Sequence, residues 1–177
     1  MPKLDFSKSA CFVYVSREGA LSSVGHDLKL QVTKFTIKSS EASLSVQAEC
    51  HADSFRVIGA IKDGRVTEKF PTPQEKQMIE KNIIEDVLEV RKYRTISFRS
   101  TAVEKVNDNR YQIAGQLDLH GVRKDLRFAV DLKAGRATAV VMISQLDFRI
   151  TPFRAFLGAL RVNPAVLVEV SVPVIDV

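Results

Sequence analysis

Apolar and polar residues alternate with a period of two through long stretches of this chain. Residues 111–119 carry apolar side chains at most of the odd positions, and residues 125–132 carry them at the even positions. Shorter runs with the same alternation occur at residues 28–32, 42–48, 96–98 and 166–174. Because successive side chains of a strand point to opposite faces, the pattern predicts strands with one buried and one solvated face. Such strands are typical of antiparallel sheets and barrels.

Turn-forming residues separate these runs. Asn107-Asp108-Asn109 and Ala134-Gly135-Arg136 each lie between two alternating segments, at the spacing of a β-hairpin. Several short strands with such turns predict an all-β sandwich or barrel. Between Val32 and Phe35 the apolar phase slips by one residue. Two interpretations stay open there: a bulge that bends one strand, or the meeting of two strands.

One segment has helical rather than strand periodicity. Thr72 is a suitable N-cap, Pro73 fits the first helical position, and Glu75 completes a capping box. Apolar residues then recur at helical spacing, namely Met78, Ile79, Ile83, Val87, Leu88 and Val90. The sequence therefore predicts one amphipathic helix over residues 73–90 that covers one end or one side of a barrel. The apolar stretch 153–160 is interpreted as a helical turn or a loop that plugs the barrel.

The length and the charge limit the classes of function. A chain of 177 residues predicts a single domain, residues 1–177. Its 26 basic residues are spread along the chain among 21 acidic ones, which argues against nucleic-acid binding despite the net charge of +5. No apolar run approaches the roughly 18–20 residues of a membrane span. Cys11 and Cys50 have no metal-binding or redox spacing and are interpreted as buried thiols rather than as a disulfide pair.

The N-terminal residues carry no recognisable secretory leader, because charge and serine precede only five apolar residues. The sequence as written therefore predicts a cytoplasmic protein. A periplasmic protein is the alternative if a leader once preceded these residues and was removed.

Candidate catalytic groups are sparse. None of His26, His51 and His120 pairs with another histidine at metal-ligand spacing, so no metal site is predicted. The stretch SSVGHDL, residues 22–28, holds serine, histidine and aspartate, but the chain lacks the GxSxG turn that would expose a serine nucleophile. The stretch LHGVRKD, residues 119–125, is interpreted as a hairpin corner at Gly121 with Arg123 and Lys124 at its exposed tip. No nucleotide-binding glycine motif is present, and we expect no enzymatic activity.

Four stretches, in order, give the chain a likeness to a known family. They are SSVGHDLKLQVTKF at 22–35, LEVRKYRTISFRST at 88–101, YQIAGQLDLHGVRKDLRF at 111–128 and ISQLDFRI at 143–150. With these motifs the chain resembles the YceI-like family of bacterial lipid-binding proteins. The resemblance implies a lipocalin-like antiparallel β-barrel of about eight strands with one inserted helix. The lumen of such a barrel would hold a long amphiphile such as a polyisoprenoid or an isoprenoid quinone.

The resemblance also suggests site residues. Lumen candidates are the larger apolar residues of the predicted strands, namely Phe12, Tyr14, Leu28, Leu30, Phe98, Leu117, Leu119, Phe128, Val130, Met142 and Phe148. Entrance candidates are Phe153, Phe156 and Leu157, and headgroup candidates are His26, Arg149 and Arg154. No cofactor is expected beyond such a lipid-like ligand.

Two further expectations concern partners. The rival function is a barrel filled by its own side chains that binds a protein partner through the helix or through basic loops. A C₂ homodimer is also compatible with the sequence, since this is the commonest symmetry of soluble oligomers.

Overall fold

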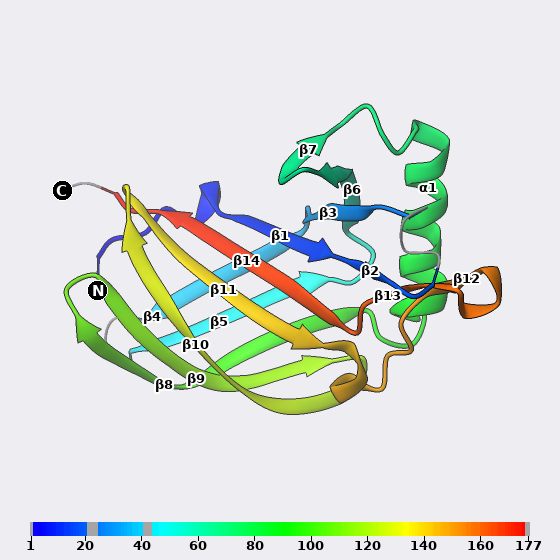
Figure 1. The fold of residues 1–177 in the computed structure, drawn as a ribbon. Coiled ribbons are helices and arrows are strands. Elements are labelled where there is room, and N and C mark those ends of the chain that lie inside the picture. The colour runs from blue at the N-terminus through cyan, green and yellow to red at the C-terminus, as the bar shows by residue number, and fades with distance from the viewer. Residues whose placement is uncertain (1, 21–24, 41–43, 176–177) are drawn as a thin grey trace.

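The main sheet of the protein takes strands from nearly the whole chain. The structure is a computed structural model that describes residues 2–20, 25–40 and 44–175. Within these residues, eleven strands form one antiparallel sheet in the order β4-β5-β8-β9-β10-β11-β14-β1-β3-β6-β7. Figure 1 shows this sheet strongly curled, with β8 to β11 on one side of the interior and β1 and β3 on the other. The all-β, lipocalin-like fold class is thus confirmed, but the strand count exceeds the eight expected.

The strand boundaries follow the alternating segments of the sequence. The main sheet consists of β1 (Ala10–Val15), β3 (Asp27–Val32), β4 (Phe35–Ser40), β5 (Ser45–His51), β6 (Phe55–Lys62), β7 (Arg65–Thr67), β8 (Thr95–Asn107), β9 (Arg110–Leu119), β10 (Val122–Lys133), β11 (Arg136–Ser144) and β14 (Ala165–Pro173). A separate small sheet has the order β12 (Arg154–Ala155), β13 (Leu160–Val162), β2 (Arg17–Glu18). Three short 3₁₀ turns are η1 (Phe6–Lys8), η3 (Gln145–Phe148) and η4 (Phe156–Gly158). The strand predicted from residue 42 begins at Ser45, and residues 42 and 43 lie outside the described residues.

A bent ribbon of two strands curls the sheet and explains the higher strand count. β3 ends at Val32 and β4 begins at Phe35, so two strands meet where the apolar phase slips. At the bend Thr33 N donates to the carbonyl of Ser54, and His51 N donates to that of Lys34, both at 3.0 Å. Beyond the bend β4 pairs with β5, whereas before it β3 pairs with β1 and β6. The ribbon consists of two chain segments, β3 with β4 and β5 with β6, and each segment counts as two strands. Because β4 and β5 stand at one end of the strand order and β3 and β6 near the other, the ribbon joins the two ends of the sheet.

The predicted hairpin turns are present. β8 and β9 are joined at residues 108–109, and β10 and β11 at Ala134–Gly135, whose φ angles are 50° and 71°. β9 and β10 are joined at His120–Gly121, with φ angles of 52° and 71°. Positive φ at both central residues is the geometry of a type I′ hairpin turn. The turn therefore consists of His120 and Gly121 alone. The expectation that Arg123 and Lys124 form its tip is wrong, because both lie within β10.

The predicted helix begins as expected but ends earlier. α1 (Pro73–Asn82) has the capping box, in which Thr72 Oγ1 accepts from Glu75 N and Glu75 Oε2 accepts from Thr72 N. It continues as the π-helical turn η2 (Ile83–Val87), and Leu88 N donates to Ile83 O at 2.8 Å. The prediction to residue 90 is wrong because Glu89 adopts a φ of 45°, which no right-handed helix accommodates.

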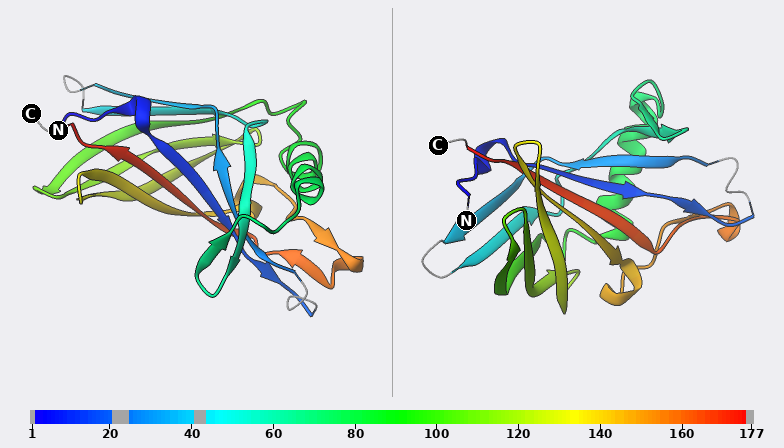
Figure 2. Two further views of the ribbon diagram at one scale, coloured as in Figure 1. Left: turned by 90° about the horizontal axis from the view of Figure 1, so that it is seen from above. Right: turned by 60° about the vertical axis from the view of Figure 1, so that its left-hand side comes forward.

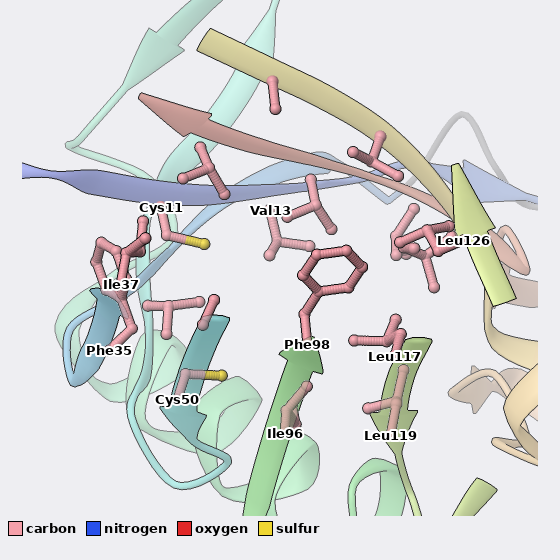
Figure 3. A pocket seen from close by; sticks show the side chains of 18 of the residues that line it. Cys11, Val13, Phe35, Ile37, Cys50, Ile96, Phe98, Leu117, Leu119 and Leu126 are labelled. Carbon is pink, nitrogen blue, oxygen red and sulfur yellow. The ribbon is translucent and has the colours of Figure 1, made fainter. Parts of the chain in front are cut away.

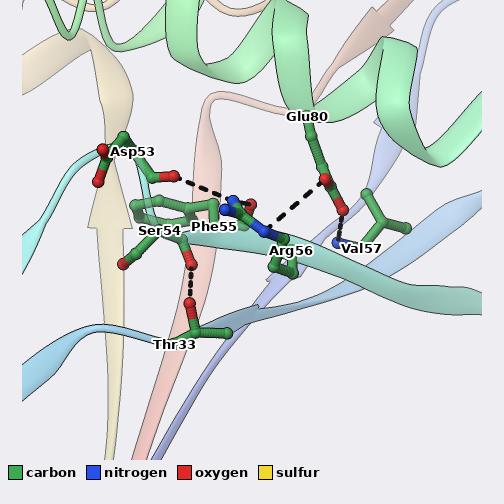
Figure 4. A network of polar contacts seen from close by, with 7 residues as sticks. All are labelled: Thr33, Asp53, Ser54, Phe55, Arg56, Val57 and Glu80. Atoms are coloured by element: carbon green, nitrogen blue, oxygen red, sulfur yellow. Dashed lines mark hydrogen bonds and ion pairs between the residues drawn. The ribbon is translucent and has the colours of Figure 1, made fainter.

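The helix is attached to the sheet at a β-bulge (Figure 4). Lys29 and Leu30 of β3 pair with Gly59 and Val57 of β6, so Ile58 is the extra residue of a bulge. Lys76 Nζ donates to the Ile58 carbonyl at 2.8 Å, and Glu80 Oε1 accepts from Val57 N at 2.8 Å. Because residues four apart lie on one helix face, this pair of side chains satisfies backbone groups on both sides of the bulge.

Removal of the Glu80 carboxylate tests this attachment. The variant Glu80→Ala leaves the part-buried Val57 N–H without its acceptor, which should lower the free energy of unfolding by about 1–3 kcal/mol. Glu80→Gln keeps an amide oxygen in place and should lose less. Glu85→Ala is the matched control, since the ion pair that Glu85 forms with Lys81 at 3.9 Å is exposed. Urea unfolding measures all three variants, and equal losses at positions 80 and 85 would contradict the attachment.

Candidate functional site

An elongated cavity of about 540 Å³ occupies the concave side of the curled sheet (Figure 3). We call this cavity the lumen. Its wall extends along β9 from Tyr111 to Leu119 and along β10 from Leu126 to Leu132. At one end it is bounded by Pro2, Leu4 and Phe6. At the other end it reaches residues of the helical segment, such as Asn82 and Ile83, together with Phe153, and we call this end the mouth. The described residues thus surround an internal space rather than form a filled barrel.

Eight of the predicted ligand-binding residues line this lumen. They are Leu28, Leu30, Phe98, Leu117, Leu119, Phe128, Val130 and Phe153. The first seven lie at the inward positions of strands whose alternation was readable in the sequence. Phe153 lies at the end called the mouth and is 37% exposed, and its role at an entrance stays a prediction.

Three lumen predictions are wrong because the strand phase was misassigned. Phe12 and Tyr14 alternate with the lining residues of β1 and point outward, and the ammonium of Lys29 lies 3.9 Å from the centroid of the Phe12 ring. Met142 likewise points outward from β11 and is 60% exposed. Both strands carry apolar residues at inward and outward positions, so alternation could not identify the inner face.

The remaining aromatic and apolar candidates lie elsewhere. Phe148, the last residue of η3, is 4% exposed and packs into the core without lining the lumen. Leu157 does not line the entrance either, because its side chain is fully exposed at a φ of 55° in η4. The side chain of Phe156 lies outside what the structure describes.

The three headgroup candidates are also absent from the lumen wall. His26 is exposed, and its ring packs 4.3 Å from that of Phe70, centroid to centroid. Arg149 is exposed at a φ of 57° immediately after η3, and Arg154 is exposed in β12. Ser22 and Ser23 of the SSVGHDL stretch lie outside the described residues, so the structure gives no account of them.

The wall includes residues that the sequence interpretation missed. On β1 the inward residues are Cys11, Val13 and Val15, and on β4 they are Phe35 and Ile37. β11 and β14 contribute the inward series Ala137, Ala139, Val141, Ile143, Val166, Val168, Val170 and Val172. Alternation of Val166 to Val172 with Glu169 was a usable signal for β14. For β1 and β11 no comparable signal exists in their own residues.

Two aromatic rings of the lumen wall lie close to each other. Phe98 points into the cavity from β8, and its ring lies 5.3 Å from that of Phe128, centroid to centroid, at an interplanar angle of 56° (Figure 3). Gly115 allows this placement, because a Cβ there would lie 2.5 Å from Phe98 Cζ and 2.4 Å from the Arg99 carbonyl oxygen. The absence of a side chain at position 115 therefore lets the Phe98 ring pack against the backbone of β9.

The lumen wall is almost entirely hydrocarbon. Its residues with polar side chains, apart from the two cysteines, are Ser39, Glu49, Asn82, Ser97, Tyr111 and Gln145. Gln145 is already engaged, since its Nε2 donates to the carbonyl of Asn163 at 3.1 Å. Among the described residues no group of three or more side chains could hold a metal ion. Such a wall suits the binding of an apolar molecule.

The two cysteines are free, and both line the lumen (Figure 3). Burial raises the pKa of the Cys11 thiol to about 12. Burial also raises the pKa of Cys50 to about 12, with smaller contributions from Cys11 and Glu49. Because only the thiolate is a strong nucleophile, both thiols are chemically quiet in the folded protein.

This environment predicts slow labelling of the thiols. In native protein at pH 8, an aromatic disulfide reagent should modify Cys11 and Cys50 far more slowly than a free thiol of ordinary pKa. In urea both should react at the rate of free cysteine. Absorbance of the released chromophore measures the rates, and fast native labelling would show that the lumen is wet or open at these positions.

His120 joins three segments near the helical end of the lumen. Its Nδ1 lies 3.2 Å from the carbonyl oxygen of Phe148, and its Nε2 lies 2.9 Å from Glu89 Oε2. The ring of Tyr93 packs on the imidazole at 4.3 Å between centroids. A hydrogen bond from Lys92 is the main cause, with a contribution from His120, of a lowered pKa of the Glu89 carboxyl. The histidine is therefore a structural link and does not contact the lumen.

Comparison with known proteins gives the same picture of the fold. A family model described as the YceI-like domain matches residues 4–174. The crystal structure of Burkholderia cenocepacia BcnA superposes with a TM-score of 0.65 at 16% identity, and the match covers 96% of this chain and 98% of that one. A polyisoprenoid binding domain from Saccharophagus degradans, implicated in plant cell wall breakdown, superposes with a TM-score of 0.60 at 16% identity, and the match covers 97% of each chain. No curated protein sequence matches this chain.

Proposed function

The chain belongs to the YceI-like family, and from this premise we propose that it binds one long isoprenoid amphiphile in its lumen, as a store or a carrier and without catalysis. The single observation that supports this proposal best is the elongated hydrocarbon wall around a cavity of about 540 Å³. Ligand cavities in proteins commonly measure about 300–1,000 Å³. The similarity to the polyisoprenoid binding domain of Saccharophagus degradans supports the choice of ligand class.

The length of the wall suits an extended chain. Tyr111 and Leu119 both line the lumen and lie eight residues apart on one strand, which corresponds to about 27 Å at about 3.4 Å per residue. An extended chain of single bonds advances by about 3.6 Å for every three bonds. The lumen therefore has room for a tail of roughly twenty bonds in one direction.

Apolar burial supplies the affinity. Each Å² of apolar ligand surface removed from water contributes about 25 cal/mol, and loss of torsional freedom in the tail offsets part of this gain. Methyl branches increase the apolar area per unit length of a tail. We therefore expect an isoprenoid tail to bind more tightly than an unbranched tail of the same length.

The polar end of the ligand lies at the mouth in this proposal. Asn82, at the end of α1, and Phe153 both line the cavity at that end. The amide of Asn82 can donate to and accept from a hydroxyl, carbonyl or quinone oxygen. Arg149 and Arg154, which the sequence suggested as headgroup residues, have no part in this arrangement because they do not line the lumen.

Extraction of the purified protein with organic solvent, followed by mass spectrometry, tests the proposal. We expect one isoprenoid alcohol, phosphate or quinone per chain. The protein stripped of lipid should rebind a polyprenol in preference to a fatty alcohol of equal chain length. Recovery of no lipid, together with failure to rebind either alcohol, would overturn the proposal. Preference for the fatty alcohol would refute the isoprenoid assignment and leave an apolar-chain carrier.

A further inference from the structure

A segment beside the mouth of the lumen exposes apolar and basic side chains together. The segment comprises residues 146–157 and includes most of η3, all of β12 and the start of η4. Leu146 is 60% exposed, Phe153 is 37% exposed, and Leu157 is fully exposed. Figures 1 and 2 show β12 and β13 projecting beyond the main sheet at the same end of the molecule as α1. Of these three residues Phe153 also lines the lumen, and large exposed apolar side chains along such a segment indicate a contact surface.

The conformation of Leu157 strengthens this interpretation. Its φ of 55° lies in the left-handed region, which is unfavourable for a residue other than glycine or asparagine. Residues held in such conformations cluster at functional sites. Because the side chain is fully exposed, no intramolecular packing of that side chain offsets the cost. The Leu157 side chain is therefore available for contact with something outside the chain.

The charges of the segment and its continuation into β13 point to an anionic partner. Residues 145–162 contain three arginines and one acidic residue, Asp147. Arg161 pairs with Glu18 at 2.6 Å. In the described part of the chain, Arg149 and Arg154 are exposed and form no side-chain hydrogen bond or ion pair. The helical side of the mouth carries charges of both signs, since Glu85 of η2 pairs with Lys81 and since Asp86, Arg91 and Lys92 are exposed.

We propose that residues 146–157 form a docking surface that brings the mouth of the lumen against an anionic lipid bilayer. Leu146, Phe153 and Leu157 enter the boundary between headgroups and acyl chains, and Arg149 and Arg154 contact lipid phosphates. Exposed apolar side chains combined with arginines are the two signals that together give stable peripheral binding. The helical side, whose acidic and basic side chains balance, has no such excess of positive charge, which favours docking through residues 146–157. The docking proposal rests on the proposed function in one respect: docking would serve the exchange of an apolar ligand between the lumen and a membrane.

Vesicle sedimentation tests the docking surface. The full chain should bind vesicles of mixed phosphatidylcholine and phosphatidylglycerol and should bind phosphatidylcholine vesicles only weakly. The double variant Arg149→Asn and Arg154→Gln should lower binding roughly twentyfold to thirtyfold, at about fivefold for each basic residue near an anionic surface. Asparagine suits position 149 because it tolerates positive φ. Leu157→Asn should lower binding roughly tenfold or more through the lost apolar contact.

Matched controls separate docking from general charge and hydrophobicity. Leu44→Asn changes another exposed leucine with positive φ, in a turn between β4 and β5. Arg110→Gln with Arg127→Gln removes two positive charges from β9 and β10. Both controls should bind the anionic vesicles like the unmodified chain. Thermal unfolding of every variant verifies that the fold is intact.

Three results would overturn the docking surface. They are equal binding to neutral and anionic vesicles, equal losses in the docking and control variants, and absence of vesicle binding altogether. A concentration-dependent dimer in analytical ultracentrifugation that Leu157→Asn abolishes would assign the surface to a second copy of the chain instead. Solvent extraction of the same variants keeps the two proposals distinguishable. Lumen lipid without vesicle binding refutes docking alone, and vesicle binding without lumen lipid refutes the proposed function alone.

Discussion

Replacement of Ala139 by tryptophan should lower the affinity for a long isoprenoid amphiphile at least tenfold. Ala139 lines the lumen from β11, and its cross-strand neighbours Val130 and Val170 line it as well. An aromatic side chain of this size covers about 150–250 Å² of surface, so the indole would project into the space that the tail needs. Exclusion of the ligand from only about 60 Å² of apolar surface corresponds to a tenfold loss at about 25 cal/mol per Å².

The next residue of the same strand is the matched control. Val140 points outward and is 50% exposed, so Val140→Trp should leave ligand affinity unchanged. The chain contains no tryptophan, and each variant therefore carries a single indole at a known position. Isothermal titration with a detergent-solubilised isoprenoid quinone measures the affinities. Emission of the single tryptophan should be blue-shifted at position 139 relative to position 140. A blue-shifted emission of Ala139→Trp would show that its indole lies inside the lumen. If the two variants then bound the quinone with equal affinity, ligand binding in the lumen would be contradicted.

Truncation of Phe148 should be among the most destabilising substitutions in the protein. Phe148 is 4% exposed in the core, and its carbonyl oxygen lies 3.2 Å from His120 Nδ1. Phe148→Ala should lower the free energy of unfolding by about 3–5 kcal/mol, the usual effect of emptying a packed aromatic site. Phe128→Ala should lower it by only about 1–2 kcal/mol, because the Phe128 ring is half-buried and already borders a cavity.

The same pair of variants should show the opposite order for ligand binding. Phe128→Ala removes part of the lumen wall and should weaken binding, whereas Phe148→Ala should preserve binding at temperatures where it stays folded. Urea unfolding and ligand titration measure the two properties separately. A larger stability loss at position 128 than at 148 would show that the division between packed core and lumen wall is wrong.

Alternation in the sequence predicted the wall only where the outer face of a strand is polar. β9 and β10 are of this kind, and Leu117, Leu119, Phe128 and Val130 lie on the inner side as expected. β1 has the sequence ACFVYV, in which both faces are apolar. The large aromatic residues of that strand point outward, while the smaller Cys11, Val13 and Val15 point inward. Because β8 and β10 turn the large rings of Phe98 and Phe128 inward while β1 turns its large rings outward, residue size could not identify the inner face.

The site at the mouth depends on contacts that no local pattern reveals. The hairpin pattern predicted that His120 lies at a corner. It could not predict that His120 contacts Glu89 and Phe148, because both are distant in sequence. The sequence could not decide between a bulge and the meeting of two strands at Thr33 for the same reason. The hydrogen bonds at this bend join Thr33 N to the carbonyl of Ser54 and His51 N to the carbonyl of Lys34, and these partners are distant in sequence. Likewise, Arg149 and Arg154 were recognisable as polar residues near an entrance, but only the fold shows that they face outward.

Photo-crosslinking tests the central claim, that the lumen holds a long apolar tail, most directly. An isoprenoid analogue with a diazirine in its tail is bound to the protein, irradiated and mapped by peptide mass spectrometry. We expect labels on inward residues such as Leu28, Leu117 and Phe128, and none on their outward neighbours Lys29, Asp118 and Arg127. Labels on the outward neighbours, or on the 146–157 segment with none in the lumen, would contradict it.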